Sequence, residues 1–386
     1  MRNSYIIITP FFPTKESFRG PFIYDQAKAI KDLGDYEVVV FKPKIWYSTA
    51  EDYIFEGIKV YQFKTYDLPS YIFPGLFDFL SNYSLKKKLK KENIKIQNIE
   101  FVHSHVTRQG SFARFLKKLN GNVTTILQHH GFDVLSLENG FLRNFRWHRK
   151  WVENDGVSIC NHIDINVGVS KKTLDYFEFF KKIQFKQTYV LYNGVDKTKF
   201  YPIPDLKNEN LFTIGCIANF WPLKDQITLL KTAKKIITEK RIQNVHLKFI
   251  GTGETLDICK QFVVENHLDK YVEFIESLPH DQLVYFYNSL DLFVLPSYWE
   301  AFGCVYTEAH ECGVPFIGVK DQGIGEIIRE ENRASQLIEK SDTESLAILI
   351  IDYYEKKLGH KPLAINLDIL VTMDKFLNFI SRDTSN

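Results

Sequence analysis

Short apolar runs alternate with longer amphipathic stretches along the whole chain. In the first half these runs are rich in Ile, Val and Phe, which is typical of strands buried on both faces. Amphipathic segments at 21–33 and 109–119 have the spacing of helices that pack against such strands. The expected strands of this half are 4–9, 37–41, 99–103, 123–128 and 164–169.

The same alternation continues in the second half of the chain. Apolar strands joined by helical crossovers form parallel sheets covered on both faces, so the predicted fold class is α/β. The expected strands are 212–218, 245–250, 272–275, 292–295 and 315–319, and the expected helices are 225–238, 255–266, 281–289 and 305–312.

The series of strands restarts near residue 210, after a turn-rich connection at 193–204. Two doubly wound, Rossmann-like domains explain this better than one very wide sheet. We expect one domain at 1–192, a second at 193–365, and a C-terminal helix within 366–386 that could pack against either domain, including back on the first. Ligands bind beyond the carboxyl ends of the strands in such sheets, so two facing sheets would place the site in a central cleft.

The net charge of the chain and its distribution limit the classes of function that can be expected. The 386 residues carry 49 basic and 47 acidic side chains, a net charge of +2, which argues against a protein whose whole body binds nucleic acid. The charge is uneven, because 1–195 holds 28 basic and 19 acidic residues whereas 196–386 holds 21 and 28. Oppositely charged halves indicate two domains with different partners.

Membrane insertion and secretion find no support in the sequence. No apolar run reaches the roughly 18 to 20 residues of a spanning helix, and the N-terminal MRNSYIIITPFFP predicts a first strand rather than a signal peptide. Five scattered cysteines without a C-x-x-C pair indicate reduced thiols and no structural zinc. We therefore expect a cytoplasmic protein.

The segment 295–309, LPSYWEAFGCVYTEA, holds the most informative chemistry. It leaves a predicted buried strand and begins a helix, and Gly303 allows close approach of the backbone to a ligand. The helix start would attract a phosphate. Glu300 and Glu308 could accept hydrogen bonds from a transferred sugar and a ribose, respectively, although an isolated pair of glutamates is more often plain surface.

This segment resembles the signature of the retaining glycosyltransferases of family 4 (glycosyl transferases group 1), which have the GT-B architecture. The family pattern P-S-x-x-E-G-F-G, then E-A and C-G-x-P, is matched except that Ala301 replaces a glycine. The resemblance implies that Glu300 is catalytic. It also implies that Phe302, Gly303, Cys304 and Glu308 bind the donor.

Further matches follow in the family's order. The stretch 190–200 resembles its interdomain segment, and 214–224, IGCIANFWPLK, resembles its first strand and basic loop. Lys224 matches the lysine that pairs with the donor diphosphate, whereas Asn219 stands near the place of a companion arginine, which weakens the expected diphosphate clamp. Gly251 and Gly253 resemble a G-x-G turn near the nucleotide, although a tight strand–helix turn explains them equally well.

The first half carries a thinner resemblance. Gly20 retains one glycine of a pair that contacts donor phosphate and acceptor in the family, and the adjacent Arg19 could add a charge to the cleft. His105 ends one predicted strand, and His130 follows another within His130-Gly131-Phe132-Asp133. The resemblance assigns both histidines to the donor sugar and diphosphate, and either could be neutral or protonated near pH 7.

Metal chemistry is not expected, because the chain has no D-x-D and no convincing cluster of ligand residues. Lys224 and the helix start at Gly303 and Cys304 would neutralise the leaving diphosphate instead. The expected site thus has no metal and no cofactor beyond the nucleotide-sugar substrate.

Two segments, 71–91 and 141–151, place aromatic residues beside lysines and arginines. This composition suits reversible contact with an anionic membrane, though solvated helix faces over buried aromatics would look the same. Single-stranded nucleic acid would also fit, but no RNA-binding motif supports it, so no nucleic-acid partner is expected.

The sequence therefore predicts a retaining, metal-independent transferase of a hexosyl or N-acetylhexosaminyl group. The donor would be a nucleotide sugar, with UDP favoured, and the acceptor a glycan or lipid-linked molecule in surface polysaccharide synthesis. Two alternatives stay open: a GT-B sugar-nucleotide epimerase and a non-catalytic sugar-nucleotide-binding subunit.

Overall fold

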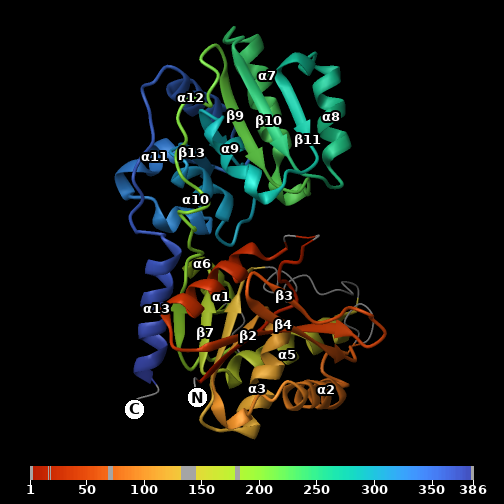
Figure 1. Ribbon diagram of the computed structural model, residues 1–386. Coiled ribbons are helices and arrows are strands. Elements are labelled where there is room, and N and C mark those ends of the chain that lie inside the picture. Colours follow the sequence, from red (N-terminus) through yellow and green to blue (C-terminus); the bar gives the residue numbers. More distant parts are fainter. Residues whose placement is uncertain are drawn as a thin grey trace. The chain divides into compact units, whose positions relative to one another are not determined.

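A computed structural model describes residues 3–15, 17, 19–67, 73–131, 145–178 and 183–383. The chain forms two compact units (Figure 1). Unit 1 comprises Met1–Gly194 together with Ile369–Asn386, and unit 2 comprises Val195–Asp368. The division lies two or three residues beyond each boundary expected from the sequence.

Unit 1 is built on an eight-stranded sheet of order β3-β4-β2-β1-β5-β6-β7-β8. Its neighbouring strands pair in parallel, except that β3 is antiparallel to β4. The strands are β1 Ser4–Ile8, β2 Glu37–Ile45, β3 Tyr53–Phe55, β4 Ile58–Thr65, β5 Ile99–His105, β6 Thr124–His129, β7 Ile165–Gly168 and β8 Thr188–Val190.

Helices cover both faces of this sheet, so unit 1 has three layers (Figure 1). One core joins the strands to α1 and α13, and the other joins them to α2, α3, α5 and α6. The helices are α1 Pro21–Leu33, α2 Asp78–Lys91, α3 Gly110–Leu119, α5 Arg146–His162, α6 Lys171–Glu178 and α13 Ile369–Asp383.

The β3–β4 hairpin was not among the strands expected from the sequence. Its two-residue turn, Glu56-Gly57, has positive φ at both positions (44° and 77°), as a type I′ hairpin turn requires. Glu-Gly is a weaker signal for this turn than Asn-Gly, and the strands are short, so the pattern is hard to recognise.

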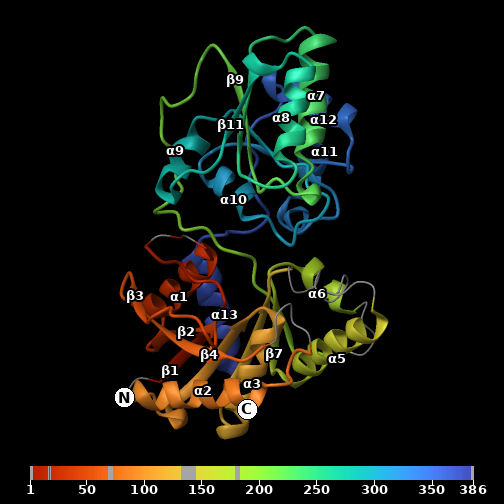
Figure 2. The ribbon, with the colours of Figure 1, turned by 90° about the vertical axis from the view of Figure 1, so that its right-hand side faces the viewer.

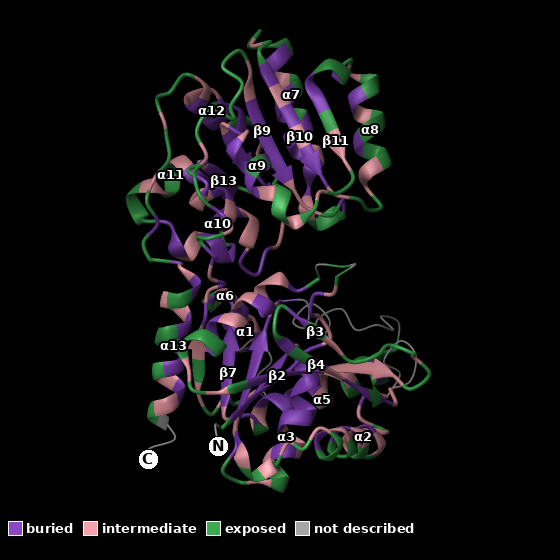
Figure 3. Cartoon of the chain, viewed as in Figure 1, coloured by how far each residue is buried: buried purple, intermediate pink, exposed green. Residues whose placement is uncertain are grey.

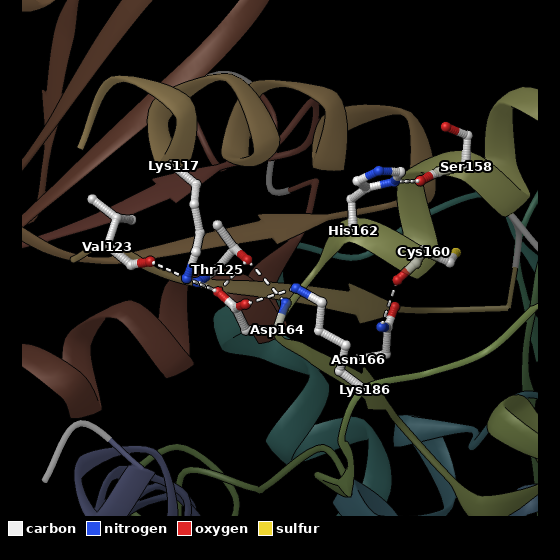
Figure 4. Close-up of polar contacts among 9 residues, drawn as sticks. All are labelled: Lys117, Val123, Thr125, Ser158, Cys160, His162, Asp164, Asn166 and Lys186. Atoms are coloured by element: carbon white, nitrogen blue, oxygen red, sulfur yellow. Dashed lines mark hydrogen bonds and ion pairs between the residues drawn. The ribbon is translucent and has the colours of Figure 1, made fainter. Parts of the chain in front are cut away.

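Asp164, directly before β7, forms hydrogen bonds that connect this end of the strand to residues around it (Figure 4). Its Oδ2 accepts hydrogen bonds from Lys117 Nζ (2.6 Å), Thr125 Oγ1 (2.8 Å) and the Thr125 N–H (3.0 Å), and its Oδ1 accepts one from Lys186 Nζ (3.1 Å). Burial alone would raise the pKa of Asp164, but the bonds from Lys117 and Thr125 outweigh it and lower the pKa.

Asp164→Ala is expected to destabilise unit 1 by about 2 to 3 kcal/mol, because it removes this acceptor and leaves buried donors unpaired. Urea unfolding followed by tryptophan fluorescence would measure the loss. Asp175→Asn is the control, since Asp175 makes only an exposed i,i+4 ion pair with Lys171. Equal stability of the two variants would contradict the role given to Asp164.

Unit 2 contains a six-stranded parallel sheet of order β11-β10-β9-β12-β13-β14. Figure 2 shows α7, α8 and α12 on one side of these strands and α9 on the other. The strands, largely buried in Figure 3, are β9 Phe212–Ile217, β10 Val245–Ile250, β11 Val272–Ile275, β12 Leu292–Val294, β13 Phe316–Val319 and β14 Leu337–Ile338. The helices are α7 Gln226–Thr238, α8 Leu256–Glu265, α9 Leu283–Asn288, α10 Cys304–Glu311, α11 Arg333–Gln336 and α12 Thr343–Tyr354.

The strand order of each sheet reverses direction once. In unit 2 the reversal lies between β9 and β12, and in unit 1 it lies between β1 and β5. Doubly wound sheets bind ligands outside the carboxyl ends of the strands at this point. The loops that follow these four strands are therefore where functional side chains are expected. Within the described ranges, no helix combines the length and apolarity needed to cross a membrane.

Candidate functional site

Lys224 and Glu300 meet in the loops after β9 and β12, where the strand order of unit 2 reverses. This place is called the switch point of unit 2. Lys224 ends the short helix Pro222–Lys224 that follows β9, and Glu300 lies in the loop that follows β12. The Nζ of Lys224 donates a hydrogen bond to Oε1 of Glu300 at 2.5 Å. The side chain of Glu300 is only 10% exposed and that of Lys224 23%, so the pair is largely removed from water. The structure thus brings together Lys224, which the sequence assigned to the donor diphosphate, and Glu300, which it assigned to the transferred sugar.

The loop of Glu300 is fixed by hydrogen bonds on both sides. The Ser297 hydroxyl donates to the Leu223 carbonyl at 2.9 Å, and the Tyr298 N–H donates to the same oxygen at 2.7 Å. The Glu300 N–H donates to Oε1 of Gln322 at 2.7 Å. Gln322 was not singled out from the sequence, because a lone glutamine after a strand carries no recognisable motif. These contacts hold Lys224 and Glu300 in register.

Helix α10 begins beside this loop. Gly303, its N-cap, has φ +89°, and a Cβ there would come within 2.7 Å of the Tyr306 ring, so the position favours glycine. Cys304 is the first helical residue, and Phe302 is buried at 1% exposure. The first N–H groups of a helix are suited to an anion, which agrees with the role expected for Gly303 and Cys304.

Glu308 lies within α10 and is oriented by a tyrosine. The Tyr287 hydroxyl donates to Oε2 of Glu308 at 2.7 Å. Burial and then the nearby Glu308 carboxylate raise the pKa of Tyr287, so the phenol keeps its proton and remains a donor. Tyr287 is a further residue that sequence reasoning missed, because nothing near it in the chain distinguishes it from a core tyrosine.

Gly251 and Gly253 lie against the loop that leads to Lys224. Their φ angles are +145° and +150°. A Cβ at Gly251 would lie 2.1 Å from the Ala218 carbonyl oxygen, and one at Gly253 would lie 2.5 Å from that of Phe220. Asn219, between these two carbonyls, is exposed. The two glycines thus allow the backbone of 218–220 to pack closely, and their contact with a nucleotide stays a prediction.

Gly20 has a comparable role in unit 1. It is the N-cap of α1, with φ +82°, and a Cβ there would lie 2.9 Å from the Phe11 carbonyl oxygen. The β1–α1 loop can therefore fold back on itself at this position only with glycine or with strain.

Two of the candidate histidines share a hydrogen bond in unit 1. His105, at the end of β5, and His130, after β6, are joined through Nδ1 and Nε2 at 2.9 Å, with their rings stacked. Burial, followed by the neighbouring His103 and His130, lowers the pKa of His105 well below its usual value. His105 is therefore neutral near pH 7. Asp133, which completes the H-G-x-D element, lies outside the described residues.

A third histidine, His103, packs against this pair. Its ring stacks on His105 at 4.4 Å, and its Nδ1 is 2.9 Å from the Tyr5 hydroxyl. Complete burial lowers the pKa of His103 to about 3, with His130 adding to the effect. His103 is a further residue that was not assigned to the site from the sequence, and the structure stacks its ring on that of His105.

The depressed pKa of His103 predicts a pH-dependent stability for unit 1. The unfolded chain protonates His103 near pH 6.5 and the folded chain near 3, so stability is complete above 6.5 and falls as the pH decreases between these values. His103→Gln stays neutral and can still accept the Tyr5 hydroxyl. We expect it to remove about 2 kcal/mol of the loss between pH 6.5 and 5. Hydrogen exchange of β5 peptides would measure this, with exposed His162→Gln as control; identical pH profiles for both variants would refute the prediction.

The candidate residues thus form two groups, one in each unit. Unit 2 holds Lys224 with Glu300, beside α10 and Glu308. Unit 1 holds His105 with His130, and Gly20 in the loop after β1.

Comparison with known families agrees with this arrangement. Residues 20–199 match the family model described as Glycosyltransferase Family 4, and residues 198–365 match the model described as Glycosyl transferases group 1. The two adjoining matches leave only the two ends of the chain uncovered.

Individual proteins are similar over most of their length. An uncharacterised glycosyltransferase of Methanocaldococcus jannaschii is 27% identical over 280 residues, 72% of each chain. The UDP-Gal:alpha-D-GlcNAc-diphosphoundecaprenol alpha-1,3-galactosyltransferase of Escherichia coli is 27% identical over 328 residues, covering 80% of this chain and 74% of that one.

Solved structures share the fold. Sucrose-phosphate synthase from Thermosynechococcus elongatus superposes with a TM-score of 0.76 at 18% identity, covering 98% of this chain and all of that one. HepE of Anabaena, solved in complex with UDP-glucose, has a TM-score of 0.71 at 16% identity, with 98% and 99% covered. The two α/β units are therefore those of a GT-B fold, as the sequence predicted.

Proposed function

The chain belongs to the glycosyltransferases of family 4, and on that premise we propose that it moves a hexosyl or N-acetylhexosaminyl group from a UDP-sugar to a hydroxyl of a glycan or lipid-linked acceptor. The anomeric configuration is retained, no metal takes part, and the product enters surface polysaccharide. The similar Escherichia coli enzyme, named for UDP-Gal and a diphosphoundecaprenol acceptor, supports the choice of donor and acceptor.

The observation that carries the proposal is the Lys224–Glu300 pair at the switch point of unit 2. On donor binding, the ammonium of Lys224 turns toward the diphosphate, which is the stronger anion, and helps to neutralise the charge that develops as the sugar departs. The carboxylate of Glu300 then accepts hydrogen bonds from the sugar hydroxyls and holds the sugar in place. Glu308, oriented by Tyr287, accepts the ribose hydroxyls.

No side chain is assigned as a covalent nucleophile. The proton of the acceptor hydroxyl passes to a donor phosphate oxygen as the new glycosidic bond forms, so the proton and the leaving group balance. The hydrogen bond between His105 and His130 fixes the two rings against each other, and both are assigned to the donor sugar and diphosphate.

A screen of nucleotide sugars tests the proposal. The donor is expected to raise the melting temperature, and the best donor is then incubated with and without acceptor glycans or prenyl-linked sugars. Release of UDP that depends on the acceptor supports transfer. A UDP-sugar converted to another UDP-sugar without acceptor would instead indicate an epimerase. Binding without any turnover would indicate a non-catalytic subunit, an alternative favoured by Asn219 at the place of an arginine.

Chelation should leave the reaction rate unchanged within about twofold, because Lys224 and the start of α10 take the role of a divalent ion at the diphosphate. The rate is measured with excess EDTA and again after added manganese or magnesium. A rate that vanished with EDTA and returned with either metal would contradict this expectation.

We further propose that unit 1 makes reversible contact with an anionic membrane through the two aromatic and basic segments. The structure describes 73–91 and 145–151 of them, and these parts lie together. The Trp151 indole N–H donates to the Pro74 carbonyl at 3.1 Å, and the Phe73 ring stacks on Trp147 at 5.5 Å. One surface, here called the aromatic face, thus replaces two separate patches. Its exposed large side chains are Leu76, Phe79, Tyr83, Phe145, Trp147 and Trp151.

The exposed charged side chains of the aromatic face are mainly basic. The carboxylates near it form ion pairs with an arginine. Arg108 forms ion pairs with Asp78, Asp67 and Asp155, the last at 4.0 Å. Four lysines on α2 and three basic residues on α5 point outward instead: Lys86, Lys87, Lys90, Lys91, Arg146, Arg149 and Lys150 are all exposed. Aromatic rings that enter the headgroup region beside lysines suit an anionic bilayer.

Sedimentation with vesicles tests this contact. The protein should bind vesicles containing phosphatidylglycerol and not pure phosphatidylcholine vesicles. Trp147→Ala/Trp151→Ala should weaken binding at least about tenfold, whereas Trp46→Ala, also an exposed tryptophan of unit 1, should not. Equal binding of both variants, or no binding to anionic vesicles, would refute the contact.

A further inference from the structure

A hollow in unit 1 lies beside the β1–α1 loop. Strand β2 extends four residues beyond its last pairing with β1, which joins Ile8 to Phe41. The extension pairs only with β4, so its other side faces a hollow of about 450 Å³. The walls that the argument uses are Thr14, Lys42, Lys44, Ser48, Tyr53 and Gln62.

Two lysines, Lys42 and Lys44, line this hollow, and neither forms an ion pair with a carboxylate among the described residues. Arg19 lies outside the lining. The Nζ of Lys42 lies 3.4 Å from the Phe12 carbonyl oxygen, its one hydrogen-bond acceptor there. The guanidinium of Arg19 lies over the adjacent Phe11 ring, 5.1 Å from its centre. Burial lowers the pKa of Lys42, and the positive charge of Arg19 lowers it further.

Hydroxyl and amide groups complete the hollow. The Tyr53 hydroxyl donates to the same Phe12 carbonyl at 3.3 Å, and burial raises its pKa to about 12, so it remains a donor. Thr14, Ser48 and Gln62 add further polar groups, and exposed Glu51 is the one acidic residue at the rim. A half-buried ammonium beside a guanidinium costs free energy that a bound anion would recover.

We propose that this hollow binds a phosphate group of the sugar acceptor, with Lys42 and Lys44 as its counter-charges. The inference rests on the proposed transfer reaction and deepens it, because it specifies a phosphate-bearing acceptor. The hollow lies beside the last four residues of β2, toward the carboxyl edge of the sheet, where His105 and His130 also lie, and doubly wound sheets bind ligands at that edge. Two separate cations match a multiply charged phosphate better than a single carboxylate.

Calorimetry with inorganic phosphate, glucose 6-phosphate and glucose tests the site. The wild-type protein should bind the two phosphates and not glucose. Lys42→Met, which keeps the aliphatic stem, should weaken phosphate binding at least about tenfold, and Arg19→Gln should weaken it by less. Lys59→Met is the control of equal charge change, because Lys59 pairs with Glu37 elsewhere on the sheet. A prenyl diphosphate in detergent distinguishes a lipid-linked phosphate from a soluble one, and Lys42-dependent binding of either supports the site.

Absence of phosphate binding to the wild type, or undiminished binding to Lys42→Met, would overturn the inference. Failure of the proposed transfer reaction is recognised separately. The proposed UDP site lies in unit 2, with Lys224 at the diphosphate, so the Lys42→Met variant should retain the wild-type melting shift with UDP.

Discussion

Glu300→Gln is expected to lower the rate of sugar transfer by roughly 100- to 1000-fold while UDP still binds with near wild-type affinity. The carboxylate is the buried anion at the switch point of unit 2, and glutamine keeps its shape but not its charge. An amide accepts hydrogen bonds more weakly and cannot stabilise positive charge on the sugar. The loss should therefore fall on kcat rather than on the affinity for the nucleotide.

Product formation with the best donor gives the rate, and calorimetry with UDP gives the affinity. Glu339→Gln is the matched control, because this exposed glutamate pairs with Lys320 on the surface of unit 2. Transfer by Glu300→Gln at the wild-type rate would remove the basis of the proposed function.

The partner of Glu300 extends this experiment to stability. Lys224→Met leaves a carboxylate of 10% exposure without its counter-charge, which should destabilise unit 2 by about 2 to 4 kcal/mol. The double variant Lys224→Met/Glu300→Gln should recover most of that loss and still fail to transfer. A double variant as unstable as Lys224→Met would show that the two side chains do not stabilise each other.

Gly251→Ala is expected to have the second large effect. A Cβ at this position would lie 2.1 Å from the Ala218 carbonyl oxygen, a distance that only movement of the backbone can relieve, and its φ of +145° already disfavours alanine. We expect a loss of about 3 kcal/mol in stability and a parallel loss of UDP binding, because 218–220 leads directly to Lys224.

Gly359→Ala is the control for this change, since no atom lies within 4 Å of the added carbon. Thermal unfolding and UDP calorimetry of both variants give the comparison. If Gly251→Ala kept wild-type stability and lost UDP binding alone, the glycine would contact the nucleotide rather than support the loop. If it lost neither, the close approach would have no energetic consequence.

Periodicity predicted the framework of both sheets because it reports burial directly. The expected limits of α1, β10 and β11 agree with the structure, since each has a sharp change from apolar to turn residues at its ends. Among the elements that were missed are the β3–β4 hairpin and α12, together with the short β8, α11 and β14. The first is too short for a clear alternation, and α12, TESLAILIIDYY, is apolar on most sides and lacks a helical stripe.

Only those residues of the candidate site that belong to sequence motifs could be predicted. The signature pointed to Glu300 and Glu308, and the match at 214–224 pointed to Lys224, but hydrogen bonds from remote positions such as Gln322 and Tyr287 have no local pattern. Likewise, Val106 adopts a φ of +72° directly after His105, which is strained for a β-branched residue and against its sequence preference. Such strain is sustained by tertiary contacts, which a one-dimensional pattern does not contain.

The C-terminal helix α13 gives the protein an order of assembly. Ile369, Met373, Phe376 and Ile380 of α13 belong to the same core as β1 and α1, although all of unit 2 separates them in the chain. During synthesis, unit 2 has every residue it needs before α13 emerges from the ribosome, while unit 1 still lacks the helix that completes the core beside α1. The half of the protein that is translated first is therefore the half that finishes folding last.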